Sequence, residues 1–169
     1  ESFDVKYRTT NVVTDFSEGF ENGLPSNWST IHNGSDGDSW ISNDNSSYAH
    51  SGTGCMYSFS TNPDEWLISP QVPLHGTLKF YLSGGGQLAQ YEHYAVYVST
   101  GTTSIDDFVM VGDERILDPS QTHNEITVDL NSFNGAMGYV AIRHFNSAGL
   151  YALILDDFSI YYYQEYGPW

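Results

Sequence analysis

The chain has 169 residues, of which 21 are Asp or Glu and only five are Lys or Arg, giving a formal net charge of −16. This acidity excludes most nucleic-acid partners, because binding a phosphate backbone requires Lys and Arg side chains. The length suits one domain, and an aromatic content of 15% indicates a folded chain. No run of about 18 apolar residues is present, so we expect no membrane span.

The two ends of the sequence differ from its middle. Residues 1–11 lack a strong hydrophobic period and are predicted to be a lead-in or linker, residues 12–163 form the expected domain, and residues 164–169 form a C-terminal tail. The single cysteine, Cys55, cannot form an internal disulfide bond. Residues 51–54 contain no basic side chain that would make its thiol reactive, so we expect a buried structural thiol.

Short runs rich in β-branched and aromatic residues alternate with Gly, Pro, Asn and Asp along the chain, a pattern that predicts strands separated by turns. The predicted strands include residues 67–69, 78–82, 94–99, 108–111, 126–130, 139–145 and 151–163. No window holds an uninterrupted apolar stripe at helical spacing. The sequence therefore predicts an all-β fold, a two-sheet jelly-roll β-sandwich.

Strand periodicity assigns side chains to faces within these runs. In residues 139–145, one face would carry Val140, Ile142 and His144, and the other Tyr139, Ala141, Arg143 and Phe145.

Two carboxylates fall on predicted apolar faces. Glu18 alternates with Phe16 and Phe20, and Asp156 alternates with Ile154, Phe158 and Ile160. A buried, unpaired carboxylate is unfavourable, and the chain has few cationic side chains to neutralise one. We therefore expect a calcium ion to neutralise both carboxylates.

The segment 33–40 carries Asp36 and Asp38 on either side of Gly37, and it could supply further oxygen ligands to Ca²⁺. The alternative is that these two aspartates only form Asx turns. Asp156 and Asp157 are adjacent and are expected to point to opposite faces of their strand, which argues against a shared catalytic cleft. No zinc spacing among the six histidines and no Gly-x-Ser-x-Gly elbow is present, so we expect no enzyme activity.

Residues 83–91 contain three consecutive glycines and are predicted to form a mobile loop. Gln87, Gln90 and Tyr91 offer adaptable hydrogen bonds and a stacking ring, which makes them the predicted ligand-binding residues. The alternative is a connector with no binding role.

Several motifs in this order resemble the cleaved-adhesin family, the adhesin or haemagglutinin domains of gingipain proteases and related surface proteins, and more distantly the MAM domain. The motifs lie at residues 19–28, 38–40, 49–52, 65–70, 92–100, 141–146 and 155–157.

The resemblance implies a non-catalytic jelly roll with structural calcium, secreted or at the cell surface, that binds a host extracellular protein or a glycan as one module of a larger protein. Strand periodicity favours Glu18 and Asp156 as metal ligands. The resemblance implies metal-facing carboxylates in residues 20–21, in the Asp38 loop and in residues 155–157. The predicted metal ligands are therefore Glu18, Glu21, Asp38 and Asp156, with Asp157 in reserve.

Two other functions remain open. A carbohydrate-binding module attached to a glycoside hydrolase would expose a line of rings, with Trp28, Trp40, Trp66 and Tyr91 as candidates. We expect the three tryptophans to lie in the core instead, because each falls within a family-like motif near a strand. A hydrolase is the third hypothesis.

Overall fold

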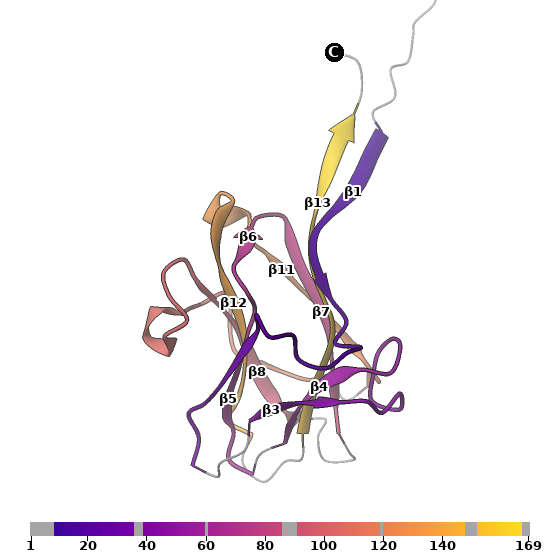
Figure 1. Ribbon diagram of the computed structural model, residues 1–169, viewed down its shortest axis with the longest axis vertical. Coiled ribbons are helices and arrows are strands. Elements are labelled where there is room, and N and C mark those ends of the chain that lie inside the picture. Colours follow the sequence, from indigo (N-terminus) through magenta and orange to yellow (C-terminus); the bar gives the residue numbers. More distant parts are fainter. Residues whose placement is uncertain are drawn as a thin grey trace, which may run out of the picture.

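Strands account for nearly all of the regular structure in the described residues (Figure 1). The structure is a computed structural model that describes residues 9–35, 39–59, 61–85, 91–118, 120–147 and 152–166. The strands are β1 (Thr9–Glu18), β2 (Ser29–His32), β3 (Trp40–Asn43), β4 (Cys55–Phe59), β5 (Asp64–Ile68), β6 (Val72–Leu74), β7 (Thr77–Gly84), β8 (His93–Ser99), β9 (Val109–Met110), β10 (Arg115–Ile116), β11 (Asn124–Asp129), β12 (Ala136–Phe145) and β13 (Ala152–Tyr166). Single 3₁₀ turns occur at Ile105–Asp107 and Asn131–Phe133. None of the helices in these segments has the length and apolar character needed to cross a membrane.

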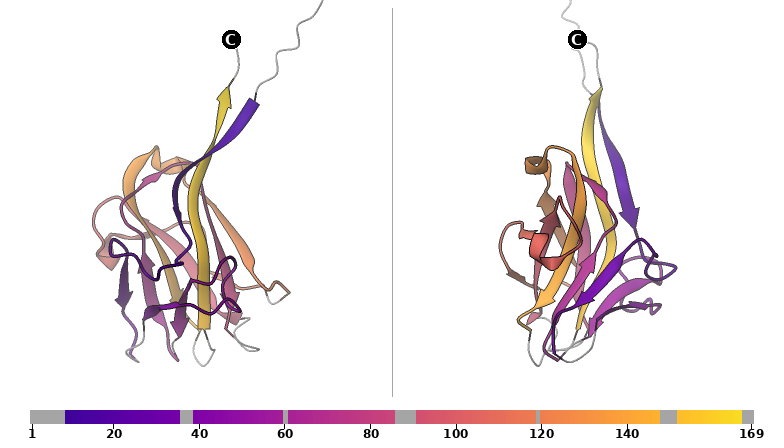
Figure 2. Two further views of the ribbon diagram at one scale, coloured as in Figure 1. Left: turned by 45° about the vertical axis from the view of Figure 1, so that its right-hand side comes forward. Right: turned by 60° about the vertical axis from the view of Figure 1, so that its left-hand side comes forward.

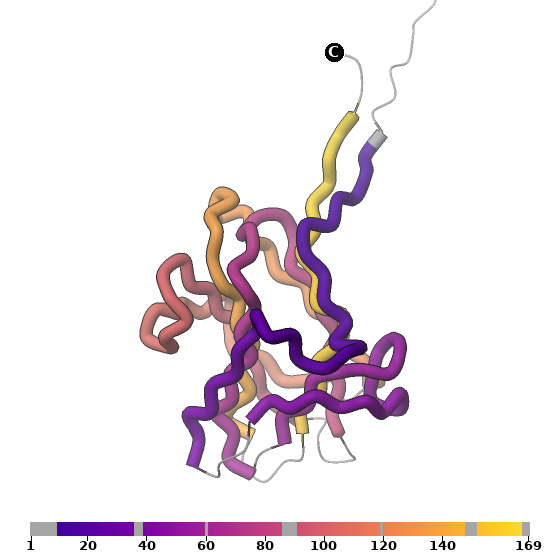
Figure 3. The backbone as a smooth tube through the Cα atoms, viewed as in Figure 1, coloured from indigo at the N-terminus to yellow at the C-terminus, as the bar shows by residue number. Residues whose placement is uncertain are grey.

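The strands form two antiparallel sheets. The first has the order β11-β7-β13-β4-β3, with β1 also paired to β13, and the second has the order β10-β8-β12-β5-β2, with β6 on β12 and β9 on β8. Most neighbours in each sheet are not consecutive in the chain, although β3 pairs with β4 and β8 with β9. The chain crosses between the sheets, as residues 19–28 do between β1 and β2 (Figure 3). The prediction of an all-β, two-sheet jelly-roll sandwich is confirmed.

The main core lies between the sheets and contains side chains that strand alternation directs inward. Val140 and Ile142 of β12 face this core, whereas Ala141 and Phe145 belong to a second cluster on the outer face of the same sheet. This outcome confirms the two faces predicted for residues 139–145. Trp28 and Trp40 lie in the main core and Trp66 in the second cluster, so all three tryptophans are buried as expected.

The face prediction for β13 is wrong on the N-terminal side of the bulge, because Ile154 does not share a face with Phe158 and Ile160. Leu155, Phe158 and Ile160 face the main core, but Ile154 packs with Cys55 and Ala49 in a third cluster. The reason is a β-bulge between Asp156 and Ser159, where Asp157 has a φ of 50°. A bulge inserts an extra residue into one strand and so shifts the alternation that follows it.

β1 and β13 extend together beyond the body of the sandwich in both views of Figure 2. They pair from Thr9 with Tyr166 to Glu18 with Phe158, whereas β7 pairs with β13 only as far as Tyr161. This ribbon reaches three residues beyond each of the predicted domain limits at 12 and 163.

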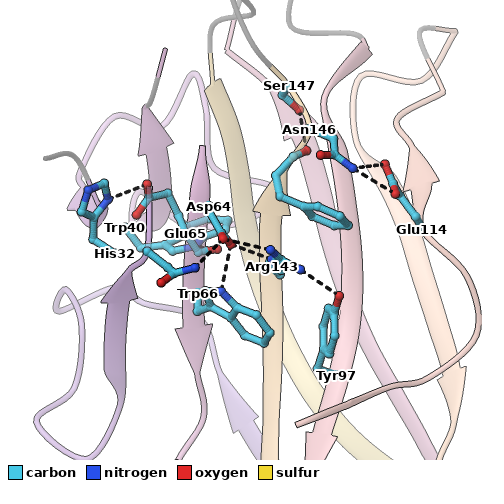
Figure 4. Close-up of polar contacts among 12 residues, drawn as sticks. His32, Trp40, Asp64, Glu65, Trp66, Tyr97, Glu114, Arg143, Asn146 and Ser147 are labelled. Carbon is cyan, nitrogen blue, oxygen red and sulfur yellow. Dashed lines mark hydrogen bonds and ion pairs between the residues drawn. The ribbon is translucent and has the colours of Figure 1, made fainter. Parts of the chain in front are cut away.

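A polar network lies on the outer face of the second sheet, around Arg143 (Figure 4). Its guanidinium donates from Nε and Nη2 to the two carboxylate oxygens of Asp64, at 2.6 and 2.9 Å, and from Nη1 to the hydroxyl of Tyr97 at 3.2 Å. The guanidinium carbon lies 4.9 Å from the ring centroid of Trp66 and 4.3 Å from that of Phe145. Bidentate, stacked geometry of this kind makes an arginine hard to replace by lysine.

The contribution of Asp64 to the stability of the fold should depend on pH. Burial acts to raise the pKa of Asp64, but hydrogen bonds from Arg143, Asn33 and Trp66 and the charge of Arg143 outweigh burial and hold it below the ordinary value. A folded-state pKa below the unfolded value gives stability that is present above about pH 4 and is lost as the pH falls through the folded pKa.

We therefore predict that Asp64→Asn lowers the free energy of unfolding at pH 7 by about 1–3 kcal/mol, and that its difference from the wild type shrinks below about pH 4. Urea titrations across this pH range measure both quantities. A difference that stays constant from pH 7 to pH 2 would contradict the role given to the Asp64 charge.

Candidate functional site

The candidate site lies where one edge of β13 changes its partner strand. β4 pairs with residues 152–155 of this edge, and β1 pairs with residues 158–166. The bulge at Asp156–Ser159 occupies the junction, so that the end of β1, the segment before β4 and the bulge meet. The predicted carboxylates at the end of β1, at Glu21 and at Asp156–Asp157 therefore lie around the same junction.

Asp156 is the buried carboxylate of the junction, with 2% of its surface exposed. Its Oδ2 accepts hydrogen bonds from the backbone N–H groups of His50 and Ser51 at 2.8 and 3.0 Å, and its Oδ1 accepts one from Asp157 at 2.7 Å. Burial raises the pKa of Asp156, assisted by the charge of Asp157, although the backbone hydrogen bonds act in the opposite direction. The ionised carboxylate is therefore held in place but incompletely compensated.

Glu21 contacts the next part of the same loop. Its Oε2 accepts hydrogen bonds from the backbone N–H groups of Thr53 and Gly54 at 2.9 and 3.3 Å. Gly52 has a φ of 59°, and a Cβ atom added there would overlap the Glu21 carboxylate. Residues 50–54 thus wrap closely around two carboxylates that come from distant segments.

The thiol of Cys55 lies beside both carboxylates. Burial raises the pKa of Cys55 to about 11, and the charges of Asp156 and Glu21 contribute in the same direction. A thiol with this pKa is protonated at neutral pH and is a poor nucleophile. Cys55 is fully buried, as expected for a structural thiol.

Asp157 and Glu18 lie on a separate, open side of the junction. Asp157 accepts a hydrogen bond from the Ser51 hydroxyl at 2.9 Å, and its other oxygen lies 2.6 Å from Nδ1 of His50. Glu18 accepts a hydrogen bond from the backbone N–H of Phe20 at 2.7 Å. With Lys79 and Tyr81 of β7, these side chains line a pocket of about 370 Å³.

The structure therefore brings together four of the predicted metal ligands, Glu18, Glu21, Asp156 and Asp157. Asp38, Gln87 and Gln90 fall outside the described residues. Tyr91 is 51% exposed, precedes β8 and does not line the pocket at the junction. The expectation that Asp156 and Asp157 point away from each other is wrong, because the bulge turns both carboxylates toward His50 and Ser51.

Sequence reasoning missed the contributions of His50, Lys79 and Tyr81. The ring of His50 is stacked on that of Tyr81, with centroids 3.5 Å apart and planes 7° apart. No local spacing signals this contact, since 30 residues separate the two rings. The glycines at 52 and 54 were the available signal that the loop approaches another group closely.

The oxygen donors of Glu21 and Asp156 suit a hard cation such as Ca²⁺, which takes about six to eight oxygen ligands. Within the residues that the structure describes, no three His, Cys, Asp or Glu side chains converge in a way that would hold a metal ion. A cation held by Glu21 and Asp156 would therefore need backbone carbonyl oxygens and water as well. The donor set fits calcium better than zinc, which binds mainly through nitrogen and sulfur.

A Ser-His-Glu chain exists elsewhere but lies in the interior. Nδ1 of His144 lies 2.8 Å from the Ser58 hydroxyl, and Nε2 of His144 lies 2.9 Å from Oε2 of Glu92. All three residues are fully buried. A substrate has no access to this serine. These hydrogen-bonded side chains therefore stabilise the packing of β4 against β12.

Comparison with known proteins agrees with the motifs and the fold. Residues 13–160 match the family model of the Cleaved Adhesin Domain. The chain is 30% identical over 168 residues to Hemagglutinin A of Porphyromonas gingivalis, covering 81% of this chain but only 6% of that much longer protein. It therefore corresponds to a small part of that relative.

Two solved structures show the same architecture. The K1 cleaved adhesin domain of Lys-gingipain from Porphyromonas gingivalis W83 matches with a TM-score of 0.76 and 32% identity over 90% of this chain and 97% of that domain. TmCBM61, solved in complex with β-1,4-galactotriose, shares the fold with a TM-score of 0.60 and 17% identity over 88% of this chain and 94% of that one. The match over residues 13–160 places this chain in the cleaved adhesin domain family.

Proposed function

We propose that the chain is a non-catalytic, calcium-stabilised binding module of a secreted or surface-displayed bacterial protein, and that it contacts a host extracellular protein or a glycan. The observation that carries this proposal is the family match over residues 13–160, together with a relative named as a hemagglutinin. The small share of that relative that the chain covers supports a module within a larger protein.

The site chemistry supports binding rather than catalysis. The cysteine beside Asp156 and Glu21 is protonated and inaccessible, and the hydrogen-bonded side chains of Ser58, His144 and Glu92 lie in the interior. The carboxylates of Glu21 and Asp156 are fixed by backbone N–H groups and have lone pairs left for a cation. We place the proposed calcium ion between these two residues, where it would offset the unfavourable burial of negative charge.

A carbohydrate-binding module attached to a glycoside hydrolase is the second candidate function. The specific observation in its favour is the pocket beside the junction, which combines the rings of His50 and Tyr81 with carboxylates and an amine. Both candidates use the same fold, and fold alone does not decide between them.

The adhesin proposal predicts saturable binding of the purified domain to erythrocytes or to immobilised extracellular-matrix proteins. Tyr91→Ser should weaken this binding about fivefold or more, because exposed tyrosines supply large contact areas at interfaces. Flow cytometry and biolayer interferometry measure the binding. Tyr163→Ser, which removes an exposed ring from the paired strands β1 and β13, is the control. Absence of saturable binding to every surface would contradict the proposal.

The calcium proposal predicts that chelation lowers the melting temperature. A ligand present at 100 times its Kd stabilises the folded state by about 2.7 kcal/mol, which corresponds to a shift of about 5–10 °C for a domain of this size. Calorimetry in EDTA, followed by readdition of CaCl₂, tests the shift and its reversal. Glu21→Gln should reduce the shift and the exposed-residue variant Asp113→Asn should keep it. Identical melting curves with and without EDTA would remove calcium from the proposal.

We further predict that Asp156→Ala lowers the free energy of unfolding by about 3 kcal/mol and Asp157→Ala by about 1 kcal/mol or less. The first substitution leaves three backbone N–H groups without their acceptor, whereas the Asp157 side chain is partly exposed. Denaturant titrations in EDTA isolate this effect from calcium binding. Equal losses in the two variants would show that the bulge places the two carboxylates differently.

A further inference from the structure

The pocket at the β13 bulge is distinct from the pair of carboxylates assigned to calcium. It lies between the end of β1 and the outward-facing side chains of β7, and its volume of about 370 Å³ falls within the range of small-molecule sites. Glu18, Asp157, His50, Lys79 and Tyr81 line it, but Glu21 and Asp156 do not. The bulge opens the pocket, because the pairing of β13 with β7 is interrupted there.

The two rings of the pocket are fixed before any ligand arrives. His50 is stacked on Tyr81 and its Nδ1 contacts the Asp157 carboxylate at 2.6 Å. The Tyr81 hydroxyl donates a hydrogen bond of 2.5 Å to Glu125. Each ring is held by the stacking and by one polar contact, so it loses little conformational entropy when a ligand binds. Each ring covers one face of the other, and together they form one rigid wall of the pocket.

The polar groups of the pocket have both signs of charge. Glu18 and Asp157 present carboxylates, and Lys79, one of only five Lys and Arg residues in the chain, presents an ammonium group. The Lys79 ammonium lies 5.7 Å from the Tyr81 ring centroid and therefore stands beside the same wall. A charged ligand would meet a like charge here, whereas a neutral ligand with several hydroxyl groups can donate to the carboxylates and accept from the ammonium.

We propose that this pocket binds a neutral sugar residue of a glycan, with its hydroxyls bound by Glu18, Asp157 and Lys79 and its ring against the wall formed by His50 and Tyr81. This inference deepens the proposed function, on which it rests, by naming the ligand class of one site. It does not require the calcium ion, because the proposed calcium ligands, Glu21 and Asp156, do not line the pocket.

The test measures binding of methyl glycosides of galactose, glucose, mannose, N-acetylglucosamine and N-acetylgalactosamine to the whole chain in calcium buffer. Saturation-transfer NMR and isothermal titration at up to about 20 mM ligand detect weak binding. We expect at least one neutral glycoside to bind, and N-acetylneuraminic acid and arginine amide to bind at least about tenfold more weakly. Absence of binding by all five glycosides, or tighter binding of a charged probe, would overturn the proposal.

Two variants assign the binding to this pocket. Glu18→Gln and Lys79→Gln should each weaken the glycoside about tenfold or more, because each removes a charged hydrogen-bonding group and keeps the approximate shape of the side chain. Tyr163→Ala is the control, since its exposed ring lies on the same strand as Asp157 but outside the pocket. Affinities equal to that of the wild type, at unchanged melting temperature, would place the sugar elsewhere and reject the pocket.

Erythrocyte binding separates this failure from that of the proposed function. Retention of saturable cell binding by a chain that binds no glycoside rejects the sugar pocket alone. Absence of binding to the glycosides, to erythrocytes and to the matrix proteins rejects the binding module as well.

Discussion

The buried carboxylate of Asp156 organises the part of the molecule that distinguishes it from a plain sandwich. Three backbone N–H groups converge on it, two of them from the loop that precedes β4. An ionised group with so little exposure is stable only when its hydrogen bonds are satisfied, so the loop has little freedom to move away. Fixing residues 50–54 then places Gly52 and Gly54 against Glu21 and directs His50 toward Tyr81.

The bulge next to Asp156 divides two adjacent aspartates between different environments. In a regular strand their side chains would lie on opposite faces of the sheet. With Asp157 at a φ of 50°, both carboxylates instead contact the same loop, one from a buried position and one from the border of an open pocket. A single irregularity therefore creates both the proposed cation position and the proposed sugar pocket. Bulges frequently occur next to functional sites for this reason.

Sequence periodicity predicted the parts of the fold in which each residue follows the regular pleat. Residues 139–145 alternate between two buried clusters as expected, because β12 lies in the middle of its sheet and both of its faces are covered. It failed in β13, since nothing local marks an aspartate with positive φ as the start of a bulge. Short strands such as β3 and β6 also gave weak signals, and their pairing depends on distant segments. Glu18 and Asp156 were predicted from their apolar neighbours, and Glu21 and Asp157 from the family resemblance. The partners of these carboxylates come largely from a loop and could be located only in three dimensions.

The scarcity of Lys and Arg also determines which groups of the protein bind its carboxylates. A chain with a net charge of −16 has few cationic side chains to pair with buried carboxylates, and for that reason we expected calcium. In the structure, other donors take much of that role. Backbone N–H groups bind Asp156 and Glu21. Five histidines also lie against carboxylates: His32, His50, His75, His93 and His144. An imidazole can donate a hydrogen bond without carrying a charge. A cation at the junction would therefore use oxygen lone pairs that these donors leave available, and it would add to a carboxylate network that is already formed by the protein.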